Sequence, residues 1–287
     1  MFYVSSSVSE RYVNPLFEVF DGGDFILSSY RDIEEDFARM RIFFEEKEQV
    51  SAARRCLESA LEIVGVKTEI EVGELADEDW KFAYRRHFKT EFVSERICTV
   101  PEWEWNDLKR VDGKVYIRLD PGMAFGTGKH ETTKACLQFI DEVSSTLNPQ
   151  FSTFLDMGCG SGILSIAAAK LGFGEVSGFD VDQEAVDASN ENAAKNGVKI
   201  AYRRFALGRA GNLPLEPADL VAANILGPLL IRFADEIAPA SRGKLIISGI
   251  LDELYPEVLA AYVKRGFREL KRKTIGEWTT GLLERIP

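Results

Sequence analysis

Short apolar runs alternate with helical patterns over the C-terminal half of the chain, from Phe151 onward. The last two apolar runs have the pattern of an antiparallel pair. This alternation favours a parallel sheet covered by helices, with ligands bound at the carboxyl ends of the strands. The expected elements are strands at 151–158, 175–180, 199–205, 218–225 and 243–251, helices at 162–171, 183–195, 228–238 and 252–265, and the closing pair 267–276 and 277–286.

The first quarter of the chain has a different order of elements. Over residues 1–73, the apolar pattern predicts strand, helix, strand, strand, helix, strand. That order indicates a small ferredoxin-like α+β domain. Residues 74–110 are rich in aromatic and charged side chains, which suits a linker helix and a docking segment. We therefore predict three parts, namely 1–73, 74–110 and an α/β domain over 111–287.

The composition limits the setting and the partners. With 287 residues and 45% hydrophobic content, the chain can bury a sizeable core and divide into two domains. No apolar run approaches the ~20 residues of a membrane span, and the N-terminus lacks the regions of a signal peptide, so we expect a cytoplasmic protein with no membrane partner. The four cysteines and two histidines lack the spacing of a zinc site or a disulfide framework. A net charge of -11 argues against stable nucleic-acid binding and mildly favours a basic protein partner.

A glycine-rich turn follows the first strand of the predicted parallel sheet. Gly158, Gly160 and Gly162 lie where the backbone must turn tightly and approach a ligand without a β-carbon in the way. A Rossmann dinucleotide fingerprint would require glycine or alanine at position 163, where this chain has Ile163. The spacing is instead D-x-G-x-G-x-G beginning at Asp156, which is typical of class I S-adenosylmethionine-dependent methyltransferases.

An acidic residue ends the second predicted strand, about twenty residues after the glycine turn. This residue is Asp180, in the sequence "GFDVD". Its carboxylate can accept hydrogen bonds from two ribose hydroxyls, each worth roughly 1.5–3 kcal/mol. The alternative is a purely structural turn in which Asp180 caps the following helix. We predict that Asp180 binds the ribose of the cofactor.

A second glycine loop lies upstream, in "LDPGMAFGTGKHETT", residues 119–133. A phosphate-binding P-loop is excluded, because Met123 stands where its first glycine should be and His130 follows the lysine. The loop leads into a helix that begins near Thr132, and it can close over a bound cofactor. An ordinary interdomain loop is the alternative. The candidate cofactor-binding residues in this segment are Phe125, Gly126, Thr127, Thr132 and Thr133.

Four segments together resemble the PrmA family, the methyltransferases of the large-subunit ribosomal protein L11. They are "LDPGMAFGTGKHETT", "LDMGCGSGILSIAAAKLG", "ANILGPLL" and "DEDWKFAYRRHFK", and the resemblance covers nearly the whole chain. The chain departs from the commonest form of the upstream loop at Lys129 and Glu131. The resemblance implies a cofactor held between that loop and the glycine turn, with Asn224 pointing at the methyl acceptor. A related branch methylates lysines of other proteins with a similar catalytic domain.

Asn224 stands at the end of the fourth predicted strand, where its carbonyl can accept a hydrogen bond from an incoming amine. The alternative is that Asn224 caps the following helix. Enzymes that methylate the amino groups of adenine or glutamine carry two prolines and an aromatic residue after a similar asparagine. This chain has Ile225 and Leu226 there, so no ring is available to stack on a flipped base.

The function expected from these features is that of an enzyme, a protein N-methyltransferase. It transfers methyl groups from S-adenosylmethionine to lysine side chains, and to the N-terminal amine as a further candidate, leaving S-adenosylhomocysteine as product. The expected substrate is ribosomal protein L11, and we expect the enzyme to be a monomer without a metal. The alternatives are a lysine methyltransferase of another protein, a small-molecule or nucleic-acid methyltransferase, and a cofactor-binding protein that has lost catalysis.

Overall fold

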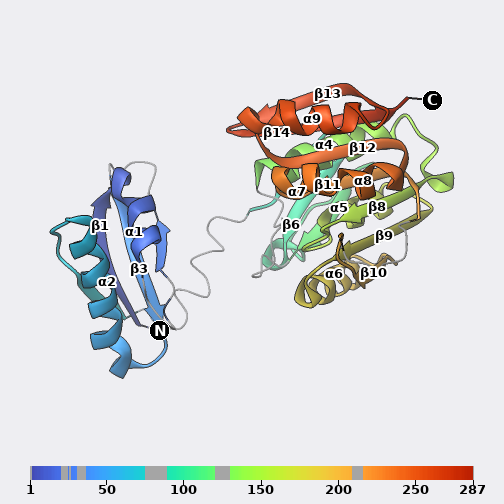
Figure 1. The fold of residues 1–287 in the computed structure, drawn as a ribbon. Helices are drawn as coiled ribbons and strands as arrows, with labels where there is room; N and C mark the ends of the chain where they lie inside the picture. Colours follow the sequence, from blue (N-terminus) through green and yellow to red (C-terminus); the bar gives the residue numbers. More distant parts are fainter. Residues whose placement is uncertain are drawn as a thin grey trace. The chain divides into compact units, whose positions relative to one another are not determined.

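The computed structural model describes residues 2–20, 25, 27–30, 37–74, 89–119, 130–208 and 216–286. The chain divides into two compact units, Met1–His87 and Phe88–Pro287 (Figure 1). The division falls inside the segment predicted as a linker, and residues 89–110 belong to the second unit. The helix predicted within that linker lies outside the described residues.

The first unit contains a four-stranded antiparallel sheet in the order β2-β3-β1-β4. The order of elements along the chain is the predicted one. The elements are β1 (Phe2–Ser9), α1 (Val13–Val19), β2 (Leu27–Tyr30), β3 (Phe37–Phe44), α2 (Val50–Val64) and β4 (Glu71–Glu74).

Periodic burial explains why these segments fold as they do. Residues of β3 alternate between buried and more exposed positions, as a strand with one face on a core requires. The buried residues of α2 are Ala53, Leu57, Ala60 and Leu61, which form one stripe along the helix. α2 ends at Gly65, whose φ of 77° is a left-handed conformation that glycine adopts readily. The unit therefore has a hydrophobic core of its own.

The main sheet of the second unit has seven strands, β8 (Thr153–Met157), β9 (Glu175–Asp180), β10 (Ala201–Arg204), β11 (Ala218–Asn224), β12 (Ser241–Leu251), β13 (Phe267–Ile275) and β14 (Trp278–Arg285). Their order is β10-β9-β8-β11-β12-β14-β13. The first five are parallel, and β14 is antiparallel to both of its neighbours. The chain order reverses between β8 and β11, and open α/β sheets bind ligands at such a point.

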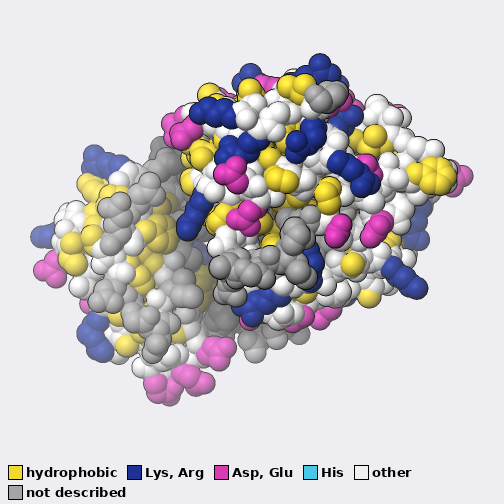
Figure 2. Space-filling view, turned by 45° about the vertical axis from the view of Figure 1, so that its right-hand side comes forward, with side chains coloured by type: hydrophobic (Ala, Val, Ile, Leu, Met, Phe, Trp, Pro, Cys, Tyr) yellow, Lys and Arg dark blue, Asp and Glu magenta, His cyan; other side chains and the backbone are white. Residues whose placement is uncertain are grey.

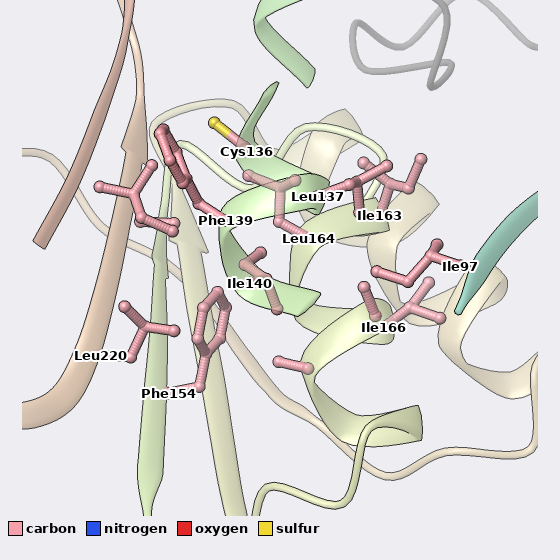
Figure 3. Close-up of a cluster of buried hydrophobic side chains, with 14 of the residues drawn as sticks. Ile97, Cys136, Leu137, Phe139, Ile140, Phe154, Ile163, Leu164, Ile166 and Leu220 are labelled. Atoms are coloured by element: carbon pink, nitrogen blue, oxygen red, sulfur yellow. The ribbon is translucent and has the colours of Figure 1, made fainter. Parts of the chain in front are cut away.

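Helices cover both faces of this sheet (Figure 1). They are α4 (Glu131–Ser144), α5 (Ile163–Lys170), α6 (Gln183–Lys195), α7 (Gly227–Arg232), α8 (Ala234–Ile237) and α9 (Tyr255–Val263). Figure 3 shows one core, in which Phe139 and Ile140 of α4 and Leu164 and Ile166 of α5 belong to one cluster with Phe154 of β8. A second core joins the sheet to α7, α8 and α9. Both faces of the sheet are therefore packed against helices.

Two predicted elements differ from the observed ones. The helix expected at 228–238 is divided into α7 and α8, with Phe233 between them in a non-helical conformation. The Tyr262 hydroxyl donates a hydrogen bond to the Leu230 carbonyl at 3.1 Å, which is the carbonyl that the Ala234 N–H would use in a continuous helix. Pro239 lacks an N–H, which limits α8 at its C-terminal end. Residues 89–110, expected as part of a linker, contain strands that extend the second unit.

These strands belong to a small sheet in the order β5-β6-β7, with β5 (Glu91–Phe92), β6 (Ile97–Pro101) and β7 (Val115–Leu119). Ile97 and Ile117 pack into the core beside α4 and α5. Asn196, at the end of α6, accepts a hydrogen bond from the Arg118 N–H at 2.8 Å and donates one to the Arg118 carbonyl at 2.6 Å. The small sheet is therefore fixed to the α/β domain by packing and by paired hydrogen bonds.

Charges of both signs are interspersed on the face of the second unit seen in Figure 2. The basic side chains of the edge strand β13 are largely paired with acids, as in Arg268 with Glu284 and Lys271 with Glu142. Charged side chains on an edge strand discourage pairing with another chain. Within the described residues, none of the helices has the length and apolar character needed to cross a membrane.

Candidate active site

Most of the predicted site residues that the structure describes lie at the carboxyl ends of β8, β9 and β11, while Thr132 and Thr133 lie in the first turn of α4. The N–H groups of Gly158 and Cys159 both donate to the Phe179 carbonyl at 2.9 Å, which joins the glycine turn to the end of β9. Asn224, the last residue of β11, lies opposite Ser248 of β12. Phe125, Gly126 and Thr127 lie outside the described residues, so their predicted role is untested.

All three glycines of the turn have positive φ, with 71° at Gly158, 53° at Gly160 and 78° at Gly162. Residues that carry a side chain rarely adopt this backbone conformation, which explains why glycine is needed here. Two of the three positions also lack room for a β-carbon. A β-carbon on Gly158 would lie 2.7 Å from Cγ2 of Ile225, and one on Gly162 would lie 2.5 Å from the Tyr202 hydroxyl. Two of these glycines therefore make room for neighbouring side chains of the protein itself.

Two side chains of α6 hold the carbonyl groups of the turn. The Ser189 hydroxyl donates to the Gly160 carbonyl, and the Asn192 amide donates to the Ser161 carbonyl, both at 2.9 Å. Ser189 and Asn192 are three residues apart and share the buried face of the helix. Neither residue was predicted from the sequence. Polar residues on the inward face of an amphipathic helix are the signal that could have identified them.

Asp180 lies beside the glycine turn and does not cap the following helix. Its Oδ2 accepts from the Gly160 N–H at 3.0 Å, and its Oδ1 accepts from the Asp182 N–H at 3.1 Å. The residue that caps α6 is Asp182, whose carboxylate accepts from the Glu184 N–H at 3.0 Å. An ionised carboxylate has about four acceptor positions, so the two bonds leave capacity for a ligand.

Asp156 is buried at the end of β8, with one oxygen paired and one unpaired. Oδ2 accepts from the Ser165 N–H at 3.1 Å and from the Ser165 hydroxyl at 2.8 Å. Oδ1 is buried and has no partner among the described residues. Burial, opposed by the Ser165 hydrogen bonds and reinforced by the negative charge of Asp180, raises the pKa of Asp156 to about 7.

Ionisation of Asp156 lowers the stability of the folded protein. Because Asp156 holds its proton more tightly in the folded protein than in the unfolded chain, the free energy of unfolding falls as the pH rises from about 4 through 7. The ionised carboxylate is then a buried negative charge with one oxygen that is unpaired among the described residues. A cationic ligand next to that oxygen would offset the cost.

Asn224 and Thr133 also present buried oxygens without a partner in the described structure. The unpaired atoms are Asn224 Oδ1 and Thr133 Oγ1. Asn224 does not cap the following helix, because the N-cap of α7 is Leu226. α4 begins at Glu131, close to the predicted start, and the Thr132 carbonyl lies 3.4 Å from the hydroxyl of Ser248.

These three oxygens come from the first turn of α4 and from the ends of β8 and β11. The hydroxyls of Thr90, before β5, and of Tyr255, at the start of α9, are also buried without a partner among the described residues. Buried polar groups in native proteins are normally hydrogen-bonded, so the coincidence of the first three at one sheet edge indicates a ligand that donates hydrogen bonds. No group of three or more metal-binding side chains occurs among the residues that the structure describes. Carboxylate, amide and hydroxyl oxygens can accept hydrogen bonds from the ammonium and hydroxyl groups of a ligand.

Comparison with known proteins identifies the family. The model of the family "Ribosomal protein L11 methyltransferase (PrmA)" matches residues 18–285. This chain belongs to the PrmA family. The predicted membership and the predicted class I methyltransferase fold are thereby confirmed.

Individual PrmA relatives are similar over most of the chain. The ribosomal protein L11 methyltransferase of Herpetosiphon aurantiacus is 33% identical over 266 residues, which are 83% of this chain and 80% of the relative. That of Azotobacter vinelandii is 41% identical over 202 residues, which are 69% of this chain and 65% of the relative. The solved structure of a ribosomal protein L11 methylase from Lactobacillus delbrueckii subsp. bulgaricus superposes with a TM-score of 0.61 and 33% identity, covering 70% of this chain and all of the other.

Proposed function

We propose that this protein transfers methyl groups from S-adenosylmethionine to amino groups of ribosomal protein L11. Lysine side chains are the main acceptors, with the N-terminal amine as a further candidate. The observation that carries the proposal is the Oδ1 of Asn224 at the end of β11, beside the glycine turn, which is buried and unpaired among the described residues. The names of the PrmA relatives support the substrate. Because ribosomal proteins are made in the cytoplasm, the enzyme acts there, and we expect it to act as a monomer.

The chain's own residues divide into those that hold the cofactor and one that faces the acceptor. Asp180 binds the ribose hydroxyls, and the glycine turn lies against the methionyl portion. Asp156 Oδ1 and Thr133 Oγ1 are the acceptors for the methionyl ammonium, since both oxygens are buried and unpaired in the described structure. S-adenosylmethionine supplies a methyl group already activated on a positively charged sulfur.

The remaining task of the protein is to orient a neutral amine. A lysine with a pKa near 10.4 must lose its proton, which costs roughly 4–5 kcal/mol at pH 7. The Asn224 carbonyl accepts a hydrogen bond from the amine N–H, which fixes the nitrogen while its lone pair stays available to attack. Alignment of this kind contributes strongly to the rate, because a misplacement of about 1 Å can cost a hundredfold.

The assignment of Asp180 is tested by its removal. Asp180→Ala should weaken S-adenosylmethionine binding by at least about 1.5–3 kcal/mol, at least tenfold, because this is the contribution of even one charge-assisted hydrogen bond to the ribose. Isothermal titration calorimetry measures this directly. The matched control is Asp182→Ala, which removes the helix cap two residues away and should leave the affinity nearly unchanged. Equal affinities of Asp180→Ala and the unaltered protein would refute the assignment.

A further inference from the structure

We propose that Tyr202 is a positioning residue of the cofactor site, which orients the Asp156 carboxylate through the Ser165 hydroxyl. This inference rests on the proposed function, because it takes Asp156 as part of the S-adenosylmethionine site. Tyr202 belongs to β10, two strands away from Asp156 in the sheet. Its hydroxyl lies 2.8 Å from the Ser165 hydroxyl and 3.5 Å from the Gly162 carbonyl, so its shorter contact, and its link to Asp156, is through Ser165.

Two glycines create the space that Tyr202 occupies. A β-carbon on Gly178 of β9 would lie 3.0 Å from the Tyr202 ring, and a β-carbon on Gly162 would lie 2.5 Å from its hydroxyl. The side chain therefore passes over the middle strand and ends beneath the glycine turn. A residue other than glycine at either position would displace it, so the fold fixes where the hydroxyl lies.

The hydroxyl of Ser165 links Tyr202 to Asp156. Its oxygen lies 2.8 Å from the Tyr202 hydroxyl, 2.8 Å from Asp156 Oδ2 and 3.0 Å from the Gly162 carbonyl. Ser165 has only one hydroxyl proton, which it can donate either to the Asp156 carboxylate or to the Gly162 carbonyl. When Tyr202 donates to Ser165, that proton is best used toward the ionised carboxylate, because hydrogen bonds in a chain strengthen one another.

This arrangement determines which carboxylate oxygen remains available. Both donors of Ser165, its N–H and its hydroxyl, bind Oδ2 of Asp156. Oδ1 is consequently left unpaired within the described structure, and it is the oxygen that we assign to the cofactor ammonium. Tyr202 stabilises this orientation of the carboxylate through its hydrogen bond with the Ser165 hydroxyl. Without it, the Ser165 proton is shared with the Gly162 carbonyl and the carboxylate is held less firmly.

The described titratable groups that interact electrostatically with the Asp156 carboxylate include no cation. They are Asp180 from β9, Cys136 from α4, Cys159 from the turn and Tyr202 from β10. Burial raises the pKa values of Cys136 and Cys159 to about 12, and it also raises the pKa of Tyr202, so all three are neutral at pH 7. Hydrogen bonds from Ser165 are therefore the main support of the charged carboxylate. Loss of the Tyr202 hydroxyl should raise the pKa of Asp156.

The test is S-adenosylhomocysteine binding by calorimetry between about pH 5.5 and 8.5, a range that spans the Asp156 pKa. Tyr202→Phe should weaken binding about fivefold at pH 7, as expected for one hydrogen bond. It should also move the midpoint of the affinity–pH profile to higher pH. Because Tyr202 acts through Ser165, adding Tyr202→Phe to Ser165→Ala should have no further effect. The control is Tyr262→Phe, which removes a buried hydrogen-bonded hydroxyl from the other core.

The outcomes separate this proposal from the proposed function. If the unaltered protein does not bind S-adenosylhomocysteine, the proposed function is refuted and the positioning role falls with it. If the unaltered protein binds and Tyr202→Phe has the same affinity and pH midpoint, only the positioning role is refuted. Equal weakening by Tyr262→Phe, or effects of Ser165→Ala and Tyr202→Phe that multiply, would show a general effect on stability and also overturn it.

Discussion

Asn224→Ala should lower the rate of methyl transfer on the order of a hundredfold while the affinity for S-adenosylmethionine stays nearly constant. The variant removes the only side-chain acceptor that we assign to the amine, and the cofactor keeps Asp180 and the glycine turn. The measurement is single-turnover methylation at saturating cofactor, together with calorimetry of cofactor binding. A large loss of rate with intact binding is the signature of a residue that orients the acceptor.

The control for Asn224→Ala is Asn190→Ala. Asn190 lies on α6, and its amide donates to the Val186 carbonyl of the same helix at 2.8 Å, so its loss should affect neither rate nor binding. The activity of the unaltered enzyme on lysine should also climb from about pH 7 to 9, as more of the amine becomes neutral. Normal turnover by Asn224→Ala, or a defect confined to cofactor binding, would show that Asn224 is structural.

A protein reduced to residues 88–287 should bind S-adenosylmethionine, but its rate of methylation of intact L11 should be lower by at least about a hundredfold. We assign substrate recognition to residues 1–73, which have their own core. All the described residues that we assign to the cofactor belong to the second unit, Phe88–Pro287. Removing a docking domain lowers the effective concentration of substrate at the site, an effect that ranges from about 10² to 10⁴. The measurement is kcat/KM on L11, with calorimetry to confirm cofactor binding.

A short lysine-containing peptide is the matched control for this truncation. Such a peptide offers an amine without the surface that a recognition domain would bind. The full chain and residues 88–287 should therefore methylate it at similar low rates. Undiminished methylation of L11 by the shorter protein would contradict the assignment and would place recognition within the α/β domain.

The parts of the site that could be predicted are those that depend on short, local sequence patterns. The D-x-G-x-G-x-G turn and Asp180 each follow a predicted strand, and parallel strands bring their carboxyl ends to one edge. That rule alone is enough to place Asp156, Asp180 and Asn224 together. The predicted element order of the first unit also follows from local patterns, since apolar alternation marks each strand.

The residues that support the site could not be predicted in the same way. Tyr202 meets Ser165 across 37 positions of sequence, and the meeting depends on Gly178 in the strand between them. Such contacts depend on the register of neighbouring strands, which a local pattern does not reveal. The short strand β5 was likewise missed, because two residues give no alternation, and its pairing with β6 is seen only in the fold.

Mass spectrometry of purified L11 after incubation with the enzyme and labelled S-adenosylmethionine tests the central claim most directly. The proposed function predicts labelled methyl groups on lysine side chains or on the N-terminal amine of L11, and their loss when Asn224 is replaced by alanine. The same reaction in a ribosome-free cell extract should label a protein of the mass of L11. An unlabelled L11 beside labelled nucleic acid, small molecules or another protein would contradict the account.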